Sequence, residues 1–198
     1  MALREELKEQ GSWLFRWRSY LPLLIIPILF IALRSSGNLE KIIGRTATHF
    51  CDYLCITLSF AGLVVRCIIV GCAADGTSGK NTKAQRAVAL NTTGMYSIVR
   101  HPLYLGNFII SIGLASFTHV WWFILVIIFG FWLYYERIMF AEEEFLRSKF
   151  GGSYLEWANK TPAFLPRFRN WQRSSLSFSF RNVLKREYTG FFPSGITG

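Results

Sequence analysis

The chain has 198 residues, of which 52% are hydrophobic, 17% aromatic and 17% charged, and its mean hydropathy is +0.29. Four long apolar stretches account for these values, which exclude an ordinary water-soluble globule and indicate an integral membrane protein. A net charge of +10 would suggest nucleic acid in a soluble protein. Here the basic residues flank the apolar stretches, so we expect anionic lipid, and no nucleic acid, as the partner.

The N-terminal segment MALREELKEQGSWLFRWRSY mixes acidic and basic residues ahead of any apolar run. This pattern differs from a secretory signal, and it predicts an amphipathic helix lying on the membrane surface. The first apolar span follows at Tyr20–Leu33. Pro27 lies inside it and is expected to kink the helix.

The second apolar span runs from about Phe50 to Ala74, with Asp52 near its start and Arg66 in its body. Ionisable residues inside spans usually face the bundle interior, so Arg66 either snorkels to the interface or belongs to an internal polar site. All four cysteines lie in or beside this span without a CxxC pair. They are expected to be apolar filler, and no metal site is expected.

The polar segment after this span contains GTSGKNTK, which resembles a phosphate-binding loop. The match fails, because Ala74 stands where the loop needs glycine and Asn81 where it needs serine or threonine. We therefore interpret the segment as a surface loop.

The third and fourth apolar spans cover Leu103–Phe117 and His119–Tyr135. One residue, Thr118, separates them, which predicts a tight helical hairpin. At 1.5 Å per residue the spans are roughly 22 and 25 Å long, short of the ~30 Å hydrocarbon core. If the last helix continues past Tyr135, the acidic run AEEE folds back over the site at the start of the third span.

These spans predict an all-α integral membrane fold with about four transmembrane helices. The segment 75–102 holds four basic residues against one acidic, and the tail from Arg167 holds six against one. The N-terminus, middle loop and tail are therefore expected on the cytoplasmic side. The tail could gather anionic lipid or simply fix the topology. One structural domain is expected, with three segments: 1–74 (lead-in and two spans), 75–168 (signature region) and 169–198 (basic amphipathic tail).

Two stretches carry a family signature: GMYSIVRHPLYLGN, and, about thirty apolar residues later, EEEFLRSKFGGSYLEWANKTPAFLP. Together they resemble the isoprenylcysteine carboxyl methyltransferase and phospholipid methyltransferase superfamily. Its signature is an R-H-P-x-Y segment, a helical hairpin, an E-E pair, F-G-x-x-Y and a proline-bearing end. The resemblance covers about Thr93 to Phe168.

The resemblance implies a membrane enzyme that uses S-adenosylmethionine, bound between the R-H-P-x-Y segment and the E-E helix. Arg100 and His101, with nearby backbone N–H groups, are expected to hold the cofactor's carboxylate. Glu142 and Glu143 match the E-E pair and are expected to hold its ammonium; Glu144 is the extra acid.

We expect Arg100, His101 and Glu142 to be the catalytic residues. The other expected cofactor-binding residues are Gly94, Tyr96, Val99, Pro102 and Tyr104, besides Glu143. Arg66 and Arg167 are the expected substrate-binding residues.

Methyl transfer requires mainly alignment and exclusion of water. A carboxylate or phosphate oxygen is already ionised at pH 7, whereas a lipid amine must lose a proton, and no base is clearly dedicated to that task. An anionic oxygen on a lipid or lipid-anchored substrate is therefore favoured. The alternatives are a phospholipid amine N-methyltransferase, an NADPH-dependent membrane enzyme like the sterol reductases, and a non-enzymatic membrane scaffold. The sequence does not decide the oligomeric state.

Overall fold

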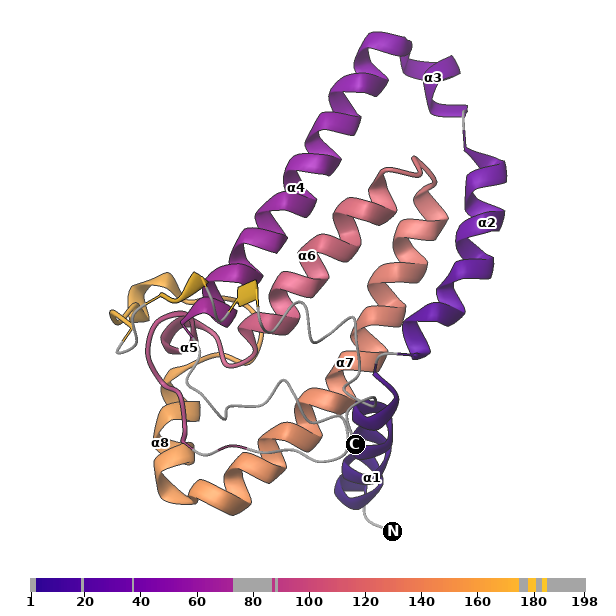
Figure 1. The fold of residues 1–198 in the computed structure, drawn as a ribbon. Helices are drawn as coiled ribbons and strands as arrows, with labels where there is room; N and C mark the ends of the chain where they lie inside the picture. Colours follow the sequence, from indigo (N-terminus) through magenta and orange to yellow (C-terminus); the bar gives the residue numbers. More distant parts are fainter. Residues whose placement is uncertain are drawn as a thin grey trace, which may run out of the picture. The chain divides into compact units, whose positions relative to one another are not determined.

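The computed structural model describes residues 3–18, 20–36, 38–72, 87, 89–174, 178–180 and 183–184. Within this part of the chain every regular element is a helix, and an isolated bridge between Gly94 and Gln172 is the only β pairing. The all-α class expected from the sequence is therefore confirmed (Figure 1). The GTSGKNTK stretch and much of the tail lie outside the described residues.

The elements follow one another along the chain as α1 (Leu3–Trp17), η1 (Leu21–Leu24), α2 (Ile25–Ser35), α3 (Asn38–Ile43), α4 (Arg45–Gly71), α5 (Met95–Ile98), α6 (Pro102–Ser116), α7 (Trp121–Phe150), α8 (Gly152–Lys160) and η2 (Phe168–Asn170). Among the described residues, three segments are long and apolar enough to cross a membrane, namely Leu21–Ile43, Arg45–Gly71 and Trp121–Phe150. α6 is apolar but has 15 residues, which gives it a length of roughly 22 Å. The chain is thus a membrane protein with three spanning candidates and one shorter apolar helix.

The chain divides into two compact units. The first contains the residues up to Val64 together with Tyr104–Phe140, and the second contains Val65–Leu103 together with the residues from Ala141 onward. Neither unit is continuous in sequence, because α4, α6 and α7 each pass from one to the other. The three sequential segments expected from the sequence stay a prediction.

The first unit is built on the α6–α7 hairpin, which confirms the predicted helical hairpin (Figure 1). Aromatic pairs join the two helices, with ring centroids 4.9 Å apart for Phe108 and Phe131 and 4.8 Å apart for Tyr104 and Tyr135. The Thr118 hydroxyl donates to the Ala115 carbonyl at 2.8 Å and so closes the end of α6 at the turn. A buried apolar cluster lies near this turn, made of Ala32, Ala115, Val120, Phe123 and Ile127.

α4 approaches α6 closely because small residues line their contact. A Cβ atom placed on Gly62 would lie 2.8 Å from Ile110 Cγ1, and one placed on Gly113 would lie 2.2 Å from Ser59 Oγ. Such contacts are how helices associate in lipid, where packing between backbones replaces the hydrophobic effect. The two glycines therefore fix the distance between α4 and α6.

Asp52, the charge near the start of the second span, has two histidine partners in the first unit. One carboxylate oxygen lies 2.8 Å from His119 Nε2, and the other lies 3.6 Å from His49 Nδ1. His119 has a φ of +56°, a value uncommon for a side chain of its size. The contact ties α4 to the turn between α6 and α7 and gives this charge a partner.

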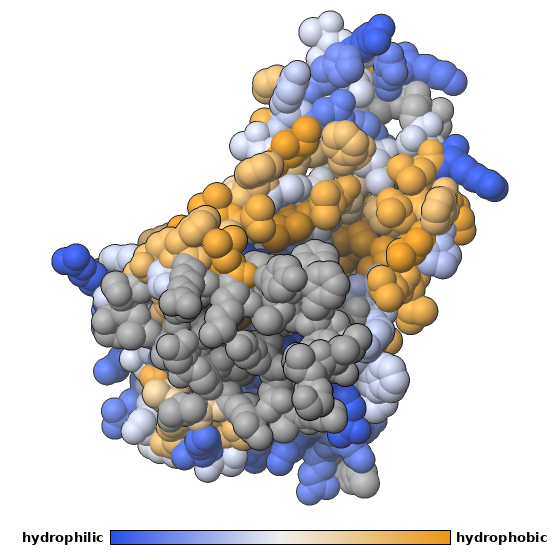
Figure 2. Space-filling model, viewed as in Figure 1, coloured by the Kyte–Doolittle hydropathy of each residue, from blue (hydrophilic) through white to orange (hydrophobic). Residues whose placement is uncertain are grey.

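α1 is the amphipathic helix that the sequence predicted. Phe15 on its inner face is buried. Two hydrogen bonds join α1 to α7. Tyr134 Oη donates to Leu14 O at 3.3 Å, and Arg137 Nε donates to Gln10 Oε1 at 2.9 Å. Figure 2 shows exposed hydrophobic residues along α2 and α4. That α1 lies on the membrane surface stays a prediction.

The structure places Pro27 near the start of a helix and not in a helix interior. Pro27 was placed inside a single apolar helix, but the segment is divided into η1 and α2, and Pro27 is the third residue of α2. A proline in the first turn lacks an N–H that would have no helical partner in any case. The 3-10 geometry of Leu21–Leu24 therefore provides the irregularity that the sequence assigned to a kink.

Candidate active site

The two halves of the signature meet in the second unit. α5 and the three residues after it run beside the segment that follows α8, and backbone hydrogen bonds join the two. These bonds run from Arg100 N to Pro162 O (2.9 Å), from His101 N to Ala163 O (3.2 Å) and from Arg167 N to Ile98 O (2.9 Å). Residues separated by about sixty positions thus form one local structure.

Gly94 lies directly before α5 and makes the backbone turn that leads into this helix. Its φ of +62° and ψ of −132° are backbone angles that residues other than glycine rarely adopt. Its N–H donates to Gln172 O at 3.0 Å, and its carbonyl accepts from the Ser97 hydroxyl at 2.7 Å. The Ser97 oxygen in turn accepts from Gln172 N at 3.0 Å. This network locks the segment before the R-H-P-x-Y motif against the chain after α8.

A cluster of four charged side chains lies where the two halves meet. Glu143 Oε2 accepts from Arg100 Nη1 at 2.9 Å, and Glu143 Oε1 lies 2.9 Å from His101 Nε2. Glu142 Oε2 lies 3.7 Å from the other ring nitrogen, His101 Nδ1. The His101 side chain is only 6% exposed, against 20% for Arg100 and 26% for Glu143. The structure therefore brings together the four residues on which the sequence interpretation depends.

The surroundings of His101 favour its charged form. Burial lowers the pKa of an imidazole, but hydrogen bonds and charge from Glu142 and Glu143 outweigh it, and the pKa of His101 is raised. The geometry gives the reason, since both ring nitrogens face carboxylates and only the imidazolium carries a donor on each.

This protonation predicts a pH-dependent stability. Because the pKa of His101 is higher in the folded chain than the ordinary value of 6.5, its contribution is complete below that value and is lost as the pH rises through the raised pKa. The difference in melting temperature between wild-type protein and His101→Gln, measured in detergent, should be largest near pH 6 and should shrink toward pH 9. A constant difference across this range would mean that His101 does not change its protonation state between pH 6 and pH 9 and would contradict the prediction.

Tyr154, on α8, is a member of this site that the sequence interpretation did not assign. Its side chain is 3% exposed, and its ring lies 5.8 Å from the ring of Trp157, which donates its indole N–H to Tyr96 O at 3.0 Å. Burial, followed by the charge of Glu143, raises the pKa of the Tyr154 phenol. In the sequence, Tyr154 is the last residue of the F-G-x-x-Y pattern, but the spacing alone did not predict a role for it.

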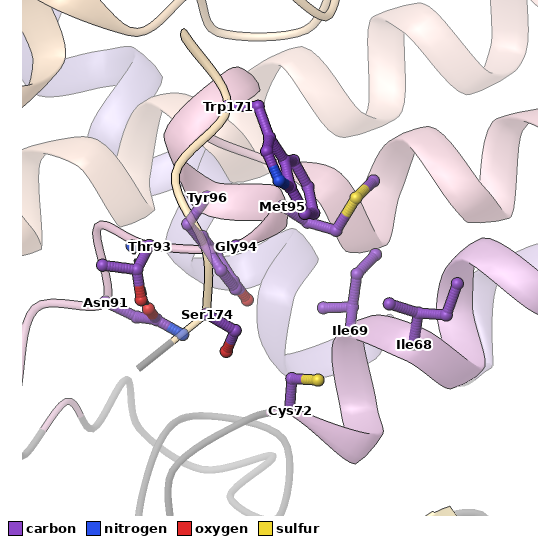
Figure 3. Close-up of a pocket in the computed structure, with 10 residues that line it drawn as sticks. All are labelled: Ile68, Ile69, Cys72, Asn91, Thr93, Gly94, Met95, Tyr96, Trp171 and Ser174. Carbon is purple, nitrogen blue, oxygen red and sulfur yellow. Dashed lines mark hydrogen bonds between the residues drawn. The ribbon is translucent and has the colours of Figure 1, made fainter. Parts of the chain in front are cut away.

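A pocket lies beside the Gly94 turn (Figure 3). Trp171 and Met95 lie next to each other on one side of it, and Ile69 of α4 contributes a further apolar wall. Asn91 and Ser174 supply polar groups. The pocket thus combines a flat aromatic surface with hydrogen-bonding side chains.

The other predicted site residues lie in varied surroundings. Val99 and Pro102 are buried, Tyr96 and Arg66 are half-buried, and Arg167 is exposed. Tyr104 belongs to the first unit, where it lies against Tyr135. Their contacts with a ligand stay predictions. Among the described residues, no group of three or more histidine, cysteine or acidic side chains is placed to hold a metal ion.

A family model described as phospholipid methyltransferase matches residues 53–153, just over half of the chain. The chain belongs to the phospholipid methyltransferase family. The matched range begins next to Asp52 and ends one residue before Tyr154, so it contains the whole charged cluster. The resemblance stated from the two signature stretches is confirmed.

Relatives of this family member include a cobalt-zinc-cadmium resistance protein, CzcN, of Cupriavidus metallidurans, 37% identical over 86 residues, which are 43% of this chain and 39% of CzcN. The protein-S-isoprenylcysteine O-methyltransferase of Schizosaccharomyces pombe is 35% identical over 89 residues, which are 43% of this chain and 36% of that protein. The protein of the same name from Saccharomyces cerevisiae is 31% identical over 121 residues, which are 61% of this chain and 51% of that protein. The chain thus spans about half or less of the length of these relatives.

Proposed function

We propose that this family member is an integral membrane methyltransferase that transfers a methyl group from S-adenosylmethionine to an anionic oxygen of a lipid or lipid-anchored substrate. The observation that carries the proposal is the cluster of Arg100, His101, Glu142 and Glu143, assembled from both halves of the signature. The two relatives named as isoprenylcysteine O-methyltransferases support the reaction class.

The side chains fit the charged end of this cofactor. Arg100 retains one N–H, at Nε, that has no partner among the described residues, and it is a donor suited to a carboxylate. Glu142, whose side chain is 19% exposed, offers negative charge toward an ammonium. When bound, S-adenosylmethionine supplies an electrophilic methyl group on a sulfonium.

The side chains around the pocket beside Gly94 suit the other end of the cofactor. The Trp171 indole offers a face on which a flat heteroaromatic base could stack, and Asn91 and Ser174 could bond to its edge (Figure 3). A Cβ atom on Gly94 would lie 3.2 Å from Ser174 Cβ, so a larger residue would narrow this space. Tyr96 lines the same pocket.

His101 positions the two acids in this proposal. Each of its ring nitrogens faces a carboxylate, so it has no free lone pair with which to accept a proton from a substrate. The preferred nucleophile is therefore one that is already ionised at pH 7, a carboxylate or a phosphate oxygen. A protonated lipid amine would need a base, and this proposal already assigns both acids of the cluster to His101, Arg100 and the cofactor. Direct contact of His101, Val99, Pro102 or Tyr104 with the cofactor, and of Arg66 or Arg167 with the substrate, is part of the proposal.

The test is transfer of a labelled methyl group from S-adenosylmethionine into membranes containing the protein, followed by separation of lipids and proteins. Label in a carboxyl methyl ester, which mild base releases as methanol, or in a methyl phosphate supports the proposal, and label in a lipid amine supports the N-methyltransferase instead. Protein carrying both Arg100→Ala and His101→Ala is the inactive control. If no label is transferred above this control, the methyltransferase assignment fails.

Ligand binding separates this function from the other classes. S-adenosylhomocysteine should raise the melting temperature of the solubilised protein, because a ligand that binds only the folded state stabilises it. Stabilisation by NADPH would favour the reductase, and no response to either ligand would favour a scaffold. The proposed orientation places both termini and the charged cluster in the cytoplasm.

A further inference from the structure

The segment 165–173 (LPRFRNWQR), here called the basic aromatic segment, carries an exposed apolar surface in the second unit. Leu165 is 78% exposed, Phe168 76% and Trp171 55%. No other large hydrophobic side chain among the described residues of this unit is as exposed as Leu165 or Phe168. Isolated exposed apolar side chains are ordinary, but several within one short segment mark an interaction surface.

Arginines alternate with these apolar side chains. Arg167, Arg169 and Arg173 are all exposed, and the segment contains no acidic residue. The absence of acids extends along the chain on both sides, since the stretch 157–186 holds seven basic residues and no aspartate or glutamate. Basic side chains interleaved with aromatic and aliphatic ones are typical of surfaces that lie in the interface of an anionic membrane.

The backbone of the basic aromatic segment is held by the rest of the second unit. Arg167 N donates to Ile98 O at 2.9 Å, and Gln172 O accepts from Gly94 N at 3.0 Å. These bonds fix the segment near both of its ends, while its arginine and large apolar side chains stay exposed. The charged and the apolar groups are therefore presented together on one fixed surface.

The bilayer supplies a partner with matching chemistry. Among the described residues, three segments are long and apolar enough to cross a membrane, so the chain is held at a lipid surface. Nucleic acid would pair with the arginines but leave Leu165 and Phe168 in water. Uncharged lipid would accept the two apolar side chains without using the charges. Anionic phospholipid satisfies both, because its headgroup phosphate binds arginine and its acyl chains receive the apolar groups.

We infer that the basic aromatic segment binds anionic phospholipids, with its arginines on the headgroups and Leu165 and Phe168 in the acyl boundary. The inference goes beyond the proposed function and does not depend on methyl transfer. It also has a consequence for the candidate site. The segment is bonded to the chain that leads into the R-H-P-x-Y motif, at Gly94 and Ile98, so bound lipid would hold this part of the site at the membrane surface.

The experiment places the photo-crosslinking residue p-benzoylphenylalanine at position 168 of the full chain. Phe168 is 76% exposed, so the larger ring should be tolerated. The protein is illuminated in nanodiscs made of equal amounts of phosphatidylcholine and phosphatidylserine, without a methyl donor, and mass spectrometry identifies what is attached to the labelled peptide. We expect lipid adducts, with phosphatidylserine in about fivefold excess, the preference of one arginine for an anionic headgroup.

Two double variants test the role of the charges. Arg169→Gln with Arg173→Gln should bring the two lipids close to equal labelling. The matched control, Arg147→Gln with Lys160→Gln, removes the same net charge from exposed positions of the second unit outside the segment, and it should keep the excess. Equal loss in both double variants would mean that net charge, and not this surface, selects the lipid.

Three results with the unsubstituted arginines would overturn the inference. Labelling that yields no lipid adduct would show that the segment does not contact the bilayer, and adducts to protein alone would assign the surface to a protein partner. Equal labelling of the two lipids would show a membrane contact without selection for negative charge. Because no methyl donor is present, each of these results leaves the proposed function untouched.

Discussion

Glu143→Gln should destabilise the protein by about 3 kcal/mol and reduce methyl transfer by about a hundredfold. Glutamine has the shape of the acid but turns one of its oxygens into a donor, which would face either Arg100 or His101. Because His101 is only 6% exposed, removing the nearer of its two carboxylate partners leaves its buried positive charge with Glu142 alone, at 3.7 Å. Unfolding in mixed micelles and labelled methyl transfer would measure the two effects.

Glu136→Gln is the matched control. Glu136 is an exposed acid on the same helix, α7, so its replacement should change stability by less than about 0.5 kcal/mol and leave transfer unchanged. If Glu143→Gln also stays within that range in stability and activity, the cluster is a surface ion network without a role in the site. Loss of stability with full activity would give it a structural role alone.

The sequence was sufficient to predict the helices and to predict that the two halves of the signature meet. Long apolar runs predict membrane helices, because lipid leaves the backbone no alternative to internal hydrogen bonds. The hairpin then returns Glu142 and Glu143 toward the start of α6, which is why residues some forty positions apart could be placed together. α7 runs unbroken to Phe150, as that reasoning requires.

The sequence was not sufficient to predict which charged side chains of the cluster pair with each other. The sequence interpretation assigned Arg100 and His101 to the carboxylate of the cofactor and the two acids to its ammonium. In the structure, Glu143 joins Arg100 to His101, because unlike charges brought together in a partly buried site pair with each other. Which further residues join the cluster depends on side-chain geometry that spacing does not determine, and for this reason Tyr154 was missed.

Pro27 and Asp52 show the same limit elsewhere in the chain. Where a helix begins decides whether a proline lies in its first turn or its interior, and the 3-10 segment Leu21–Leu24 carries no distinct signal among apolar residues. Asp52 has as its partner His119, 67 positions away. Each histidine and each acid was visible in the sequence, but the contact depends on how α4 packs against the hairpin turn.

Gly113→Val should lower the stability of the first unit by about 3 kcal/mol, the upper part of the range for overpacked sites. The first carbon of any side chain at this position would lie 2.8 Å from Ser59 N and 2.9 Å from Cys55 O, besides 2.2 Å from Ser59 Oγ. Two of these atoms belong to the backbone of α4, so a change of rotamer cannot relieve the contact and the helices must separate. Reversible unfolding in mixed micelles, followed by circular dichroism, would measure the loss.

Gly130→Val is the control for the change of residue type itself. Gly130 lies in apolar α7, and a Cβ atom there would meet nothing within 4 Å. Both replacements exchange glycine for the same β-branched residue within a helix, so their intrinsic helix preferences change equally. The difference between the two variants therefore isolates the close approach of α4 and α6. Equal stabilities for the two would mean that these helices do not pack at the small-residue contact, and the arrangement of the first unit would have to be revised.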